Sequence, residues 1–248
     1  MKQYIQIDCP DCQSEDLVKH GYSENGTQRY RCKACGRSFQ WEYTYTAWLP
    51  GVKEQIITQT LNSSGVSDVS RNLDITKPTV IAELRRQEPA EVNLAYAEYL
   101  KQQTLPGLEI EIRVEADEFW SYVGNKDNQR WTWYALDRAN GVLLAHQNGR
   151  RTDEMCEQLL AKLDMFPITA YYTDGWQSYA KYLPAEQHQV GKQDTWKIER
   201  SNLNFRTRLK RLHRKTICFS KNETIHDNVI GLYIEQEYYN STDYAQAA

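Results

Sequence analysis

The chain has 248 residues, which suits two modest domains or one large one. Hydrophobic residues make up 40% of the sequence and charged residues 25%, a balance typical of globular proteins. No run of about eighteen apolar residues is present, and residues 1–12 lack the apolar stretch of a secretion signal. We therefore expect a cytoplasmic protein without a membrane span.

The net charge is −3, but a segment in the last quarter of the chain is strongly basic. Residues 197–221 contain nine lysines and arginines and one acid, Glu199. A local basic stripe in an otherwise acidic chain is the electrostatic pattern of a nucleic-acid contact. The alternative interpretation is a solvated helix face. The basic residues are Lys197, Arg200, Arg206, Arg208, Lys210, Arg211, Arg214, Lys215 and Lys221.

Four of the six cysteines form two pairs near the N-terminus, Cys9-Pro10-Asp11-Cys12 and Cys32-Lys33-Ala34-Cys35. Each pair offers two thiolates from one tight turn, and four soft ligands suit a tetrahedral zinc ion. Because cysteine fills all four positions, no coordination position is left open for catalysis. We predict a structural zinc ribbon over residues 1–48. The alternative is one redox-active pair with two bystander cysteines.

Residues 51–88 predict three short helices, at 53–62, 66–73 and 77–87. This pattern is typical of a helix-turn-helix domain, whose last helix enters the major groove with its first residues on the base edges. The alternative is a plain three-helix packing unit. As a DNA reader, the domain would contact bases through Thr76, Lys77, Thr79 and Glu83, and phosphates through Arg85 and Arg86.

The rest of the chain predicts a connector and an α/β domain. The connector covers residues 89–107, and residues 90–103 within it have helical spacing. Residues 108–248 predict three strands, the last two joined by the hairpin signal Asn140-Gly141, and then alternating helices and strands. This is the order of a ribonuclease-H-like fold with a mixed sheet, so the whole chain is an α+β multidomain protein. The expected strands are 112–123, 131–136, 142–147, 168–173 and 187–190, and the expected helices are 153–165, 176–182, 198–212 and 224–238.

Three acids in this last domain have distinctive settings: Asp117 in the first strand, Asp174 at the end of the fourth, and Glu199 at the start of the basic helix. In this fold the first and fourth strands are neighbours, so the three carboxylates can converge. Clustered carboxylates suit hard divalent cations, Mg²⁺ or Mn²⁺, and two such ions can assist a phosphoryl displacement. Glu118 follows Asp117 but should point to the opposite face of the strand.

Several motifs of the chain resemble the insertion sequence 1 family of bacterial transposases. They are Asp117-Glu118-Phe119-Trp120-Ser121-Tyr122-Val123-Gly124, Thr173-Asp174-Gly175-Trp176, Ile198-Glu199-Arg200-Ser201-Asn202-Leu203-Asn204 and His226-Asp227-Asn228-Val229-Ile230-Gly231. The resemblance implies that Asp117, Asp174 and Glu199 form the family's catalytic, metal-binding triad. It also implies that the N-terminal ribbon and helix-turn-helix bind terminal inverted repeats, that the protein works as a multimer, and that it acts at the bacterial nucleoid.

Further site candidates lie on the last two helices. Asn202 and Arg206 share a helix face with Glu199, so we predict that they contact the DNA strand being cut, together with Arg208, Lys210 and Arg211. His226 lies where a helix could return it to the carboxylates to orient water or phosphate; a structural role is the alternative. For Trp120 and Trp176 we favour packing around the site over stacking on a splayed base.

The combined interpretation is a DDE transposase that cuts double-stranded DNA at the ends of its element and transfers the freed 3′-hydroxyls to target DNA. Two alternatives remain. One is a related nuclease that never joins strands. The other is a DNA-binding repressor whose nuclease-like domain is inactive.

Overall fold

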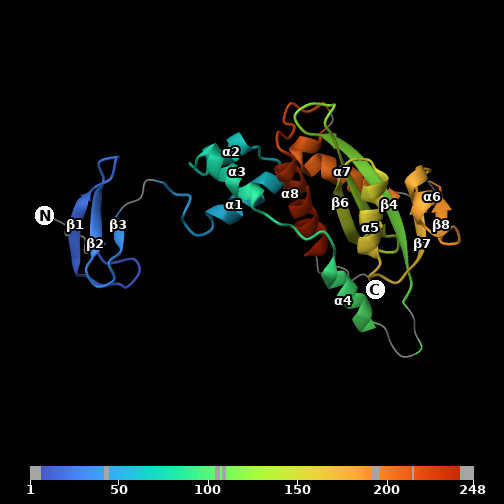
Figure 1. Cartoon of the computed structure of the whole chain (residues 1–248), viewed down its shortest axis with the longest axis horizontal. Helices are drawn as coiled ribbons and strands as arrows, with labels where there is room; N and C mark the ends of the chain where they lie inside the picture. Colours follow the sequence, from blue (N-terminus) through green and yellow to red (C-terminus); the bar gives the residue numbers. More distant parts are fainter. Residues whose placement is uncertain are drawn as a thin grey trace. The chain divides into compact units, whose positions relative to one another are not determined.

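The computed structural model describes residues 7–41, 45–103, 107, 110–191, 196–213 and 215–240, and the chain divides into two compact units (Figure 1). The first unit is Met1–Leu49 and the second is Pro50–Ala248. The predicted fold class is confirmed in both units.

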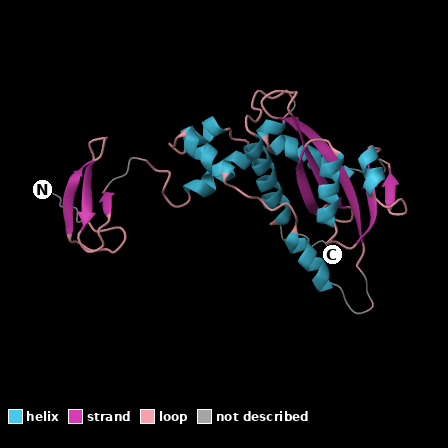
Figure 2. Cartoon of the chain, viewed as in Figure 1, coloured by secondary structure: helices cyan, strands magenta, loops and turns pink. Residues whose placement is uncertain are grey.

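The first unit is a small antiparallel sheet of three strands in the order β1-β2-β3 (Figure 2). The strands are β1 (Leu17–Tyr22), β2 (Gln28–Cys32) and β3 (Ser38–Gln40). Among the described residues its buried core contains only Cys9, Cys32 and Phe39, with a few half-buried side chains against it. So small a core buries little apolar surface, and a unit of this size usually needs a metal or disulfide to fold.

The second unit begins with three helices, α1 (Val52–Leu61), α2 (Val66–Asn72) and α3 (Lys77–Arg85). Thr76 caps α3, since its side chain accepts a hydrogen bond from the Thr79 backbone N–H. Val69, Val80 and Leu84 are fully buried and form the shared core. These positions give the helix-turn-helix arrangement that the sequence predicts.

The connector differs from the sequence prediction at its start. A helix was expected from residue 90, but α4 spans Leu94–Gln103. Val92 instead forms an antiparallel bridge with Ala145, and the Asn93 backbone N–H donates to the Leu144 carbonyl (2.8 Å). The side chain of Asn93 accepts from the Tyr96 N–H (2.9 Å) and so caps the helix. Pairing with the sheet edge therefore overrides local helical preference in these residues.

The large sheet has five strands in the order β6-β5-β4-β7-β8. β4, β5 and β6 are antiparallel, and β7 and β8 run parallel to β4. This is the ribonuclease-H-like arrangement. The strands are β4 (Ile112–Tyr122), β5 (Gln129–Asp137), β6 (Leu143–Gly149), β7 (Ile168–Thr173) and β8 (His188–Val190).

Helices cover both faces of this sheet (Figure 2). Trp133 and Ala135 pack with the buried residues Cys156 and Leu159 of α5 and with Tyr179 of α6 on one face. On the other face, Phe119 and Tyr134 pack against Phe205 of α7, at ring distances of 4.9 and 5.6 Å. The helical elements are α5 (Asp153–Leu163), α6 (Gln177–Tyr182), α7 (Trp196–Arg208), η1 (Lys210–Leu212), α8 (Glu223–Ile234) and η2 (Glu235–Tyr239).

The basic helix is shorter than predicted. A continuous helix was expected to residue 212, but α7 ends at Arg208 and Leu209 is extended. Leu209 is almost fully buried, so its side chain fills the core at the point where the helix stops. Arg206 and Arg208 therefore lie on α7, whereas Lys210 and Arg211 lie on the separate turn η1.

The helix-turn-helix packs against α8 within the second unit. The Asn228 side-chain amide donates to the carbonyls of Leu84 (3.0 Å) and Arg85 (3.1 Å) at the end of α3. Ser63, between α1 and α2, donates to the Arg208 carbonyl. The predicted DNA reader is thus docked on the same body as the carboxylates.

Candidate metal centres and nucleic-acid interface

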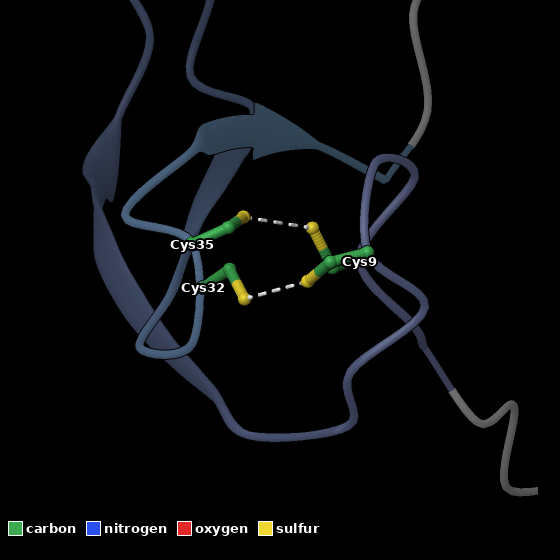
Figure 3. A group of neighbouring side chains, drawn as sticks. Cys9, Cys32 and Cys35 are labelled. Atoms are coloured by element: carbon green, nitrogen blue, oxygen red, sulfur yellow. Dashed lines mark hydrogen bonds between the residues drawn. The ribbon is translucent and has the colours of Figure 1, made fainter.

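The four N-terminal cysteines converge between the two turns that carry them (Figure 3). Sulfur–sulfur distances are 3.6 Å for Cys9–Cys35 and 3.6 Å for Cys12–Cys32. A disulfide needs about 2.05 Å, whereas four sulfurs at about 2.3 Å from one zinc ion lie about 3.8 Å apart. The group therefore fits a structural zinc ion.

Asp117 and Asp174 are brought together by strand register. β4 and β7 are parallel neighbours in which Glu115 pairs with Tyr172, so each aspartate lies two residues beyond that pair. Side-chain oxygens of Asp117, Glu118 and Asp174 lie within 4.8 Å of one another. Three hard oxygen donors at this spacing suit a divalent cation.

A cavity of about 140 Å³ opens between these strands and the start of α7. Its lining includes Asp117, Asp174 and Glu199, so the structure brings all three predicted acids to one cavity. Glu199 is exposed and is not part of the tight carboxylate group. The Asn202 amide donates to Asp117 (2.9 Å), while its buried carbonyl oxygen has no hydrogen-bond partner among the described residues. A bound cation or DNA group would satisfy that oxygen.

Glu118 is the acid that the sequence interpretation set aside. The sequence predicts that it points to the opposite face of the strand from Asp117; Arg151 donates to it (2.9 Å from Nε), and it lies 3.4 Å from the Tyr179 hydroxyl. Yet its carboxylate still reaches the Asp117 and Asp174 group. Burial, and next the negative charge of Asp174, raise the pKa of Glu118 to about 7. No motif signalled this role beyond its place next to Asp117.

Arg151 was also missed by sequence analysis. Its guanidinium lies over the rings of Trp131 (4.9 Å) and Trp176 (4.8 Å) and reaches to 3.9 Å from Asp174. Contact with indole faces holds a cation by attraction to the ring. Trp176 therefore packs around the carboxylate site, as the sequence interpretation favoured.

The structure does not place His226 among the carboxylates. Its imidazole is fully buried, with Nε2 2.9 Å from the Ser121 hydroxyl and Nδ1 2.8 Å from the Ser220 hydroxyl. Burial, and next the positive charge of Arg211, lower the pKa of His226 to about 3. The role of orienting water or phosphate at the carboxylates is therefore replaced by a structural one, in which a neutral histidine joins β4 to the segment before α8.

The residues of the helix-turn-helix that were predicted to contact DNA divide into two groups by their exposure. Thr76 and Lys77 are exposed and Thr79 is half-buried at the start of α3, and Arg85 is exposed near its end. Glu83 is buried and forms an ion pair with Arg86 at 2.6 Å. Glu83 is therefore unsuited to a base contact, whereas Arg86 remains exposed while it is paired with Glu83.

The predicted strand contacts lie on two elements. Asn202 and Arg206 line a second cavity that also includes Glu199. Arg208 is exposed, and Lys210 lies 3.8 Å from Asp68 of α2. Arg211 donates to the Ser220 hydroxyl (3.2 Å) and the Ile225 carbonyl (3.4 Å). Arg214, part of the predicted basic stripe, lies outside the described residues.

A zinc ribbon, a helix-turn-helix and a ribonuclease-H-like domain with clustered carboxylates together define a DNA transposase of the DDE class. Residues 110–240, more than half of the chain, match the family model described as IS1 transposase. The chain belongs to the IS1 transposase family, which confirms the resemblance seen in the sequence. Residues 4–36 match the InsA N-terminal domain and residues 43–87 match the InsA C-terminal domain.

Curated relatives match about half of the chain. The insertion element iso-IS1n protein InsB of Shigella dysenteriae is 51% identical over 122 residues, which is 49% of this chain and 93% of the relative. The insertion element IS1 protein InsB of Shigella flexneri is 45% identical over 125 residues, 50% of this chain and 95% of the relative. The insertion element IS1 4 protein InsB of Escherichia coli K12 is 42% identical over 134 residues, which is 54% of this chain and 80% of the relative.

Among the described residues, no helix combines the length and the apolar character that crossing a membrane requires.

Proposed function

We propose that this chain binds the terminal inverted repeats of an insertion sequence, cuts a DNA strand at each end of the element and joins the freed 3′-hydroxyls to target DNA. One observation carries the proposal: strand register places Asp117 beside Asp174, in a cavity that Glu199 also lines. The cavity leads directly to the basic helix α7, where a DNA backbone would be attracted.

Asp117, Asp174 and Glu199 would hold Mg²⁺ or Mn²⁺, with Glu118 within reach as a further ligand. When bound, these cations would supply Lewis-acid stabilisation to the attacking and leaving oxygens of a phosphoryl displacement. The all-oxygen donor set supports hard cations over softer ones.

The surrounding residues fix the carboxylates in place. Asn202 donates to Asp117, and the Trp176 backbone N–H donates to Asp174 (2.9 Å). Arg151 offsets the negative charge of Glu118 and lies close to Asp174. Such fixed donors keep clustered carboxylates in one geometry despite their mutual repulsion. Arg206, further along the α7 face, would contact the phosphates of the cut strand.

End recognition would belong to the N-terminal half. Thr76, Lys77 and Thr79 are accessible at the start of α3, the part of a recognition helix that meets base edges. Arg85 would contact phosphates, and the zinc ribbon would add to the binding surface. Because the two ends of an element must be held together, we also propose a homo-oligomer.

Two alternatives make different predictions. A nuclease without strand transfer would cut the end but leave a pre-cut end unjoined, so supplying a pre-cut end and looking for joined products separates it from a transposase. A repressor with an inactive second half would bind the ends and show no divalent-metal-dependent cleavage.

The test is cleavage of end DNA, taken from the sequence that flanks this reading frame. Asp117→Asn, Asp174→Asn and Glu199→Gln should each slow metal-dependent cleavage by at least about 100-fold, because a metal ligand supports several kcal/mol of transition-state stabilisation. End binding, measured without divalent metal, should change little.

Asp127→Asn is the matched control, since Asp127 is an exposed aspartate outside the cavity; it should cleave normally. Full activity of Asp117→Asn or Asp174→Asn would contradict the proposal. Glu199→Gln should also weaken Mn²⁺ binding; weaker binding in Glu118→Gln together with normal binding in Glu199→Gln would make Glu118 the third ligand instead.

A further inference from the structure

A third cavity lies along the part of β4 that extends past β7. β7 pairs with β4 from Ile112 to Glu115, so the later residues of β4 run beyond it. There a cavity of about 330 Å³ opens beside the end of α7 and η1. Its lining includes Trp120, Tyr122, Lys126, Arg206, Arg211 and Lys215.

The strand side of this cavity is aromatic. The rings of Trp120 and Tyr122 are 5.6 Å apart, and the ring of Phe219 packs against Tyr122 at 5.4 Å. Both Trp120 and Tyr122 are half-buried, so packing fixes each ring while part of it remains accessible. Fixed aromatic faces of this kind stack on unpaired nucleobases of any sequence.

The charged part of the lining is cationic. Lys126 and Lys215 are exposed, and none of the described residues that line the cavity is acidic. Arg211 is bound only to uncharged oxygens of Ser220 and Ile225, and no described carboxylate forms an ion pair with it. Burial lowers the pKa of Arg211 to about 10, yet the group remains charged at neutral pH. A partly buried guanidinium without an anionic partner suits a phosphate.

The cavity is also connected to the carboxylates through shared lining residues. The carboxylate cavity and the second cavity share Glu199, and the second and third cavities share Arg206 and His213. A DNA strand that follows these adjoining cavities along α7 would thus bring a nucleotide near the cut to Trp120 and Tyr122.

We propose that this third cavity binds one nucleobase of the element's terminal DNA, unstacked from the duplex, with Trp120 and Tyr122 against the base and Arg211, Lys126 and Lys215 near its phosphates. The inference rests on the proposed function and adds a substrate subsite to it. An unstacked base widens access to the neighbouring phosphate, at a cost of a few kcal/mol for breaking its stack.

The experiment uses full-length protein and end duplexes that carry one abasic nucleotide at successive positions around the cut. Affinity is measured by fluorescence anisotropy without divalent cation, and single-turnover cleavage is measured with Mg²⁺. Trp120→Ala should weaken binding and slow cleavage of the intact duplex about tenfold. At one position, removing the base should restore the variant to within about threefold of wild type, because no base then has to be unstacked and held.

Trp120→Phe is the matched control that keeps a ring, and it should retain most of both activities. Lys126→Ala with Lys215→Ala gives a second test that does not disturb packing: the slope of log affinity against log salt should flatten by about 1.4 to 1.8, whereas Lys101→Ala, on the exposed side of α4, should leave it unchanged. Absence of rescue at every position, with a defect of Trp120→Phe equal to that of Trp120→Ala, would overturn the subsite. If wild type itself fails to cut the end, the proposed function fails instead.

Discussion

His226 is enclosed by protein and held at both ring nitrogens by serine hydroxyls. Two hydroxyl partners can serve a neutral imidazole as one donor and one acceptor. A protonated ring would need two acceptors and would place a charge near Arg211 and Arg130, both of which lower its pKa. The residue thus stabilises the fold only while it is neutral.

Acid should therefore destabilise the second unit through this residue. The pKa of His226 is about 3 in the folded chain against an ordinary 6.5, so the unfolded chain binds more protons between these values and stability falls as pH falls below about 6.5. At pH 5 the loss from this residue should be about 2 kcal/mol. Urea unfolding of wild type and His226→Asn at pH 7 and pH 5 measures it.

His226→Asn should reduce the loss of unfolding free energy between pH 7 and pH 5, whatever its effect on stability at pH 7. His146→Asn should reduce this loss as well, since burial lowers the pKa of His146 to about 3, and the double variant should show the sum. Equal pH dependence in wild type and His226→Asn would contradict the interpretation.

The individual acids show how far sequence reasoning reaches at this scale. Asp117 and Asp174 could be predicted because neighbouring strands and the motifs around them fix their positions. Glu118 and Arg151 could not, because their contact joins β4 to the segment before α5, and Tyr179 of α6 lies beside it. The same alternation rule that places Glu118 on the other face says nothing about how far its carboxylate reaches.

At the scale of elements, the ribbon depends on its cysteines more than on its core. Its strands are short, and only Cys9, Cys32 and Phe39 are buried among the described residues. Metal binding must then supply most of the free energy of folding, as in other small zinc sites.

Cys32→Ser should therefore unfold the ribbon and release a single zinc ion per chain, while the second unit keeps its own melting transition. Elemental analysis and calorimetry measure the two effects. Cys218→Ser is the matched control, because Cys218 is exposed and remote from the cysteine group in sequence. Zinc-free protein with a folded ribbon would refute a structural zinc site.

Helix ends were harder to predict than helices. Nothing between Arg208 and Leu212 is Gly or Pro, so the sequence pattern runs on through a break that the structure makes at Leu209. Burying the Leu209 side chain stabilises the fold more than continuing the helix would, because helical preference is worth only a few tenths of a kcal/mol per residue. Val92 and Asn93 escape prediction for the same reason, since their partners lie on a distant strand.

At the scale of the whole molecule, the docking of α3 on α8 joins two proposed sites that lie far apart in the sequence. Asn228 binds the last carbonyls of α3, groups that would otherwise need water. The proposed recognition helix α3 and the carboxylates therefore share one compact unit, residues 50–248.

Asn228→Ala should weaken the packing of α3 on α8. Losing two hydrogen bonds to helix-end carbonyls should cost about 1 to 2 kcal/mol, and hydrogen exchange of the α3 amides should speed up before that of β4. Thr224→Ala, an exposed change on the same helix, is the control and should leave exchange in α3 as in wild type. Unchanged exchange in Asn228→Ala would show that apolar packing alone holds the two parts.

The contact between Asn228 and the end of α3 also predicts where mutations with the same phenotype should lie in the gene. If α3 reads the element's ends, a screen for alleles that no longer recognise them would be expected to return codons 51–88. Because Asn228 supports α3 from a distant part of the sequence, codons around 228 belong to the same phenotypic class, and intragenic suppressors of lesions in α3 should be sought there.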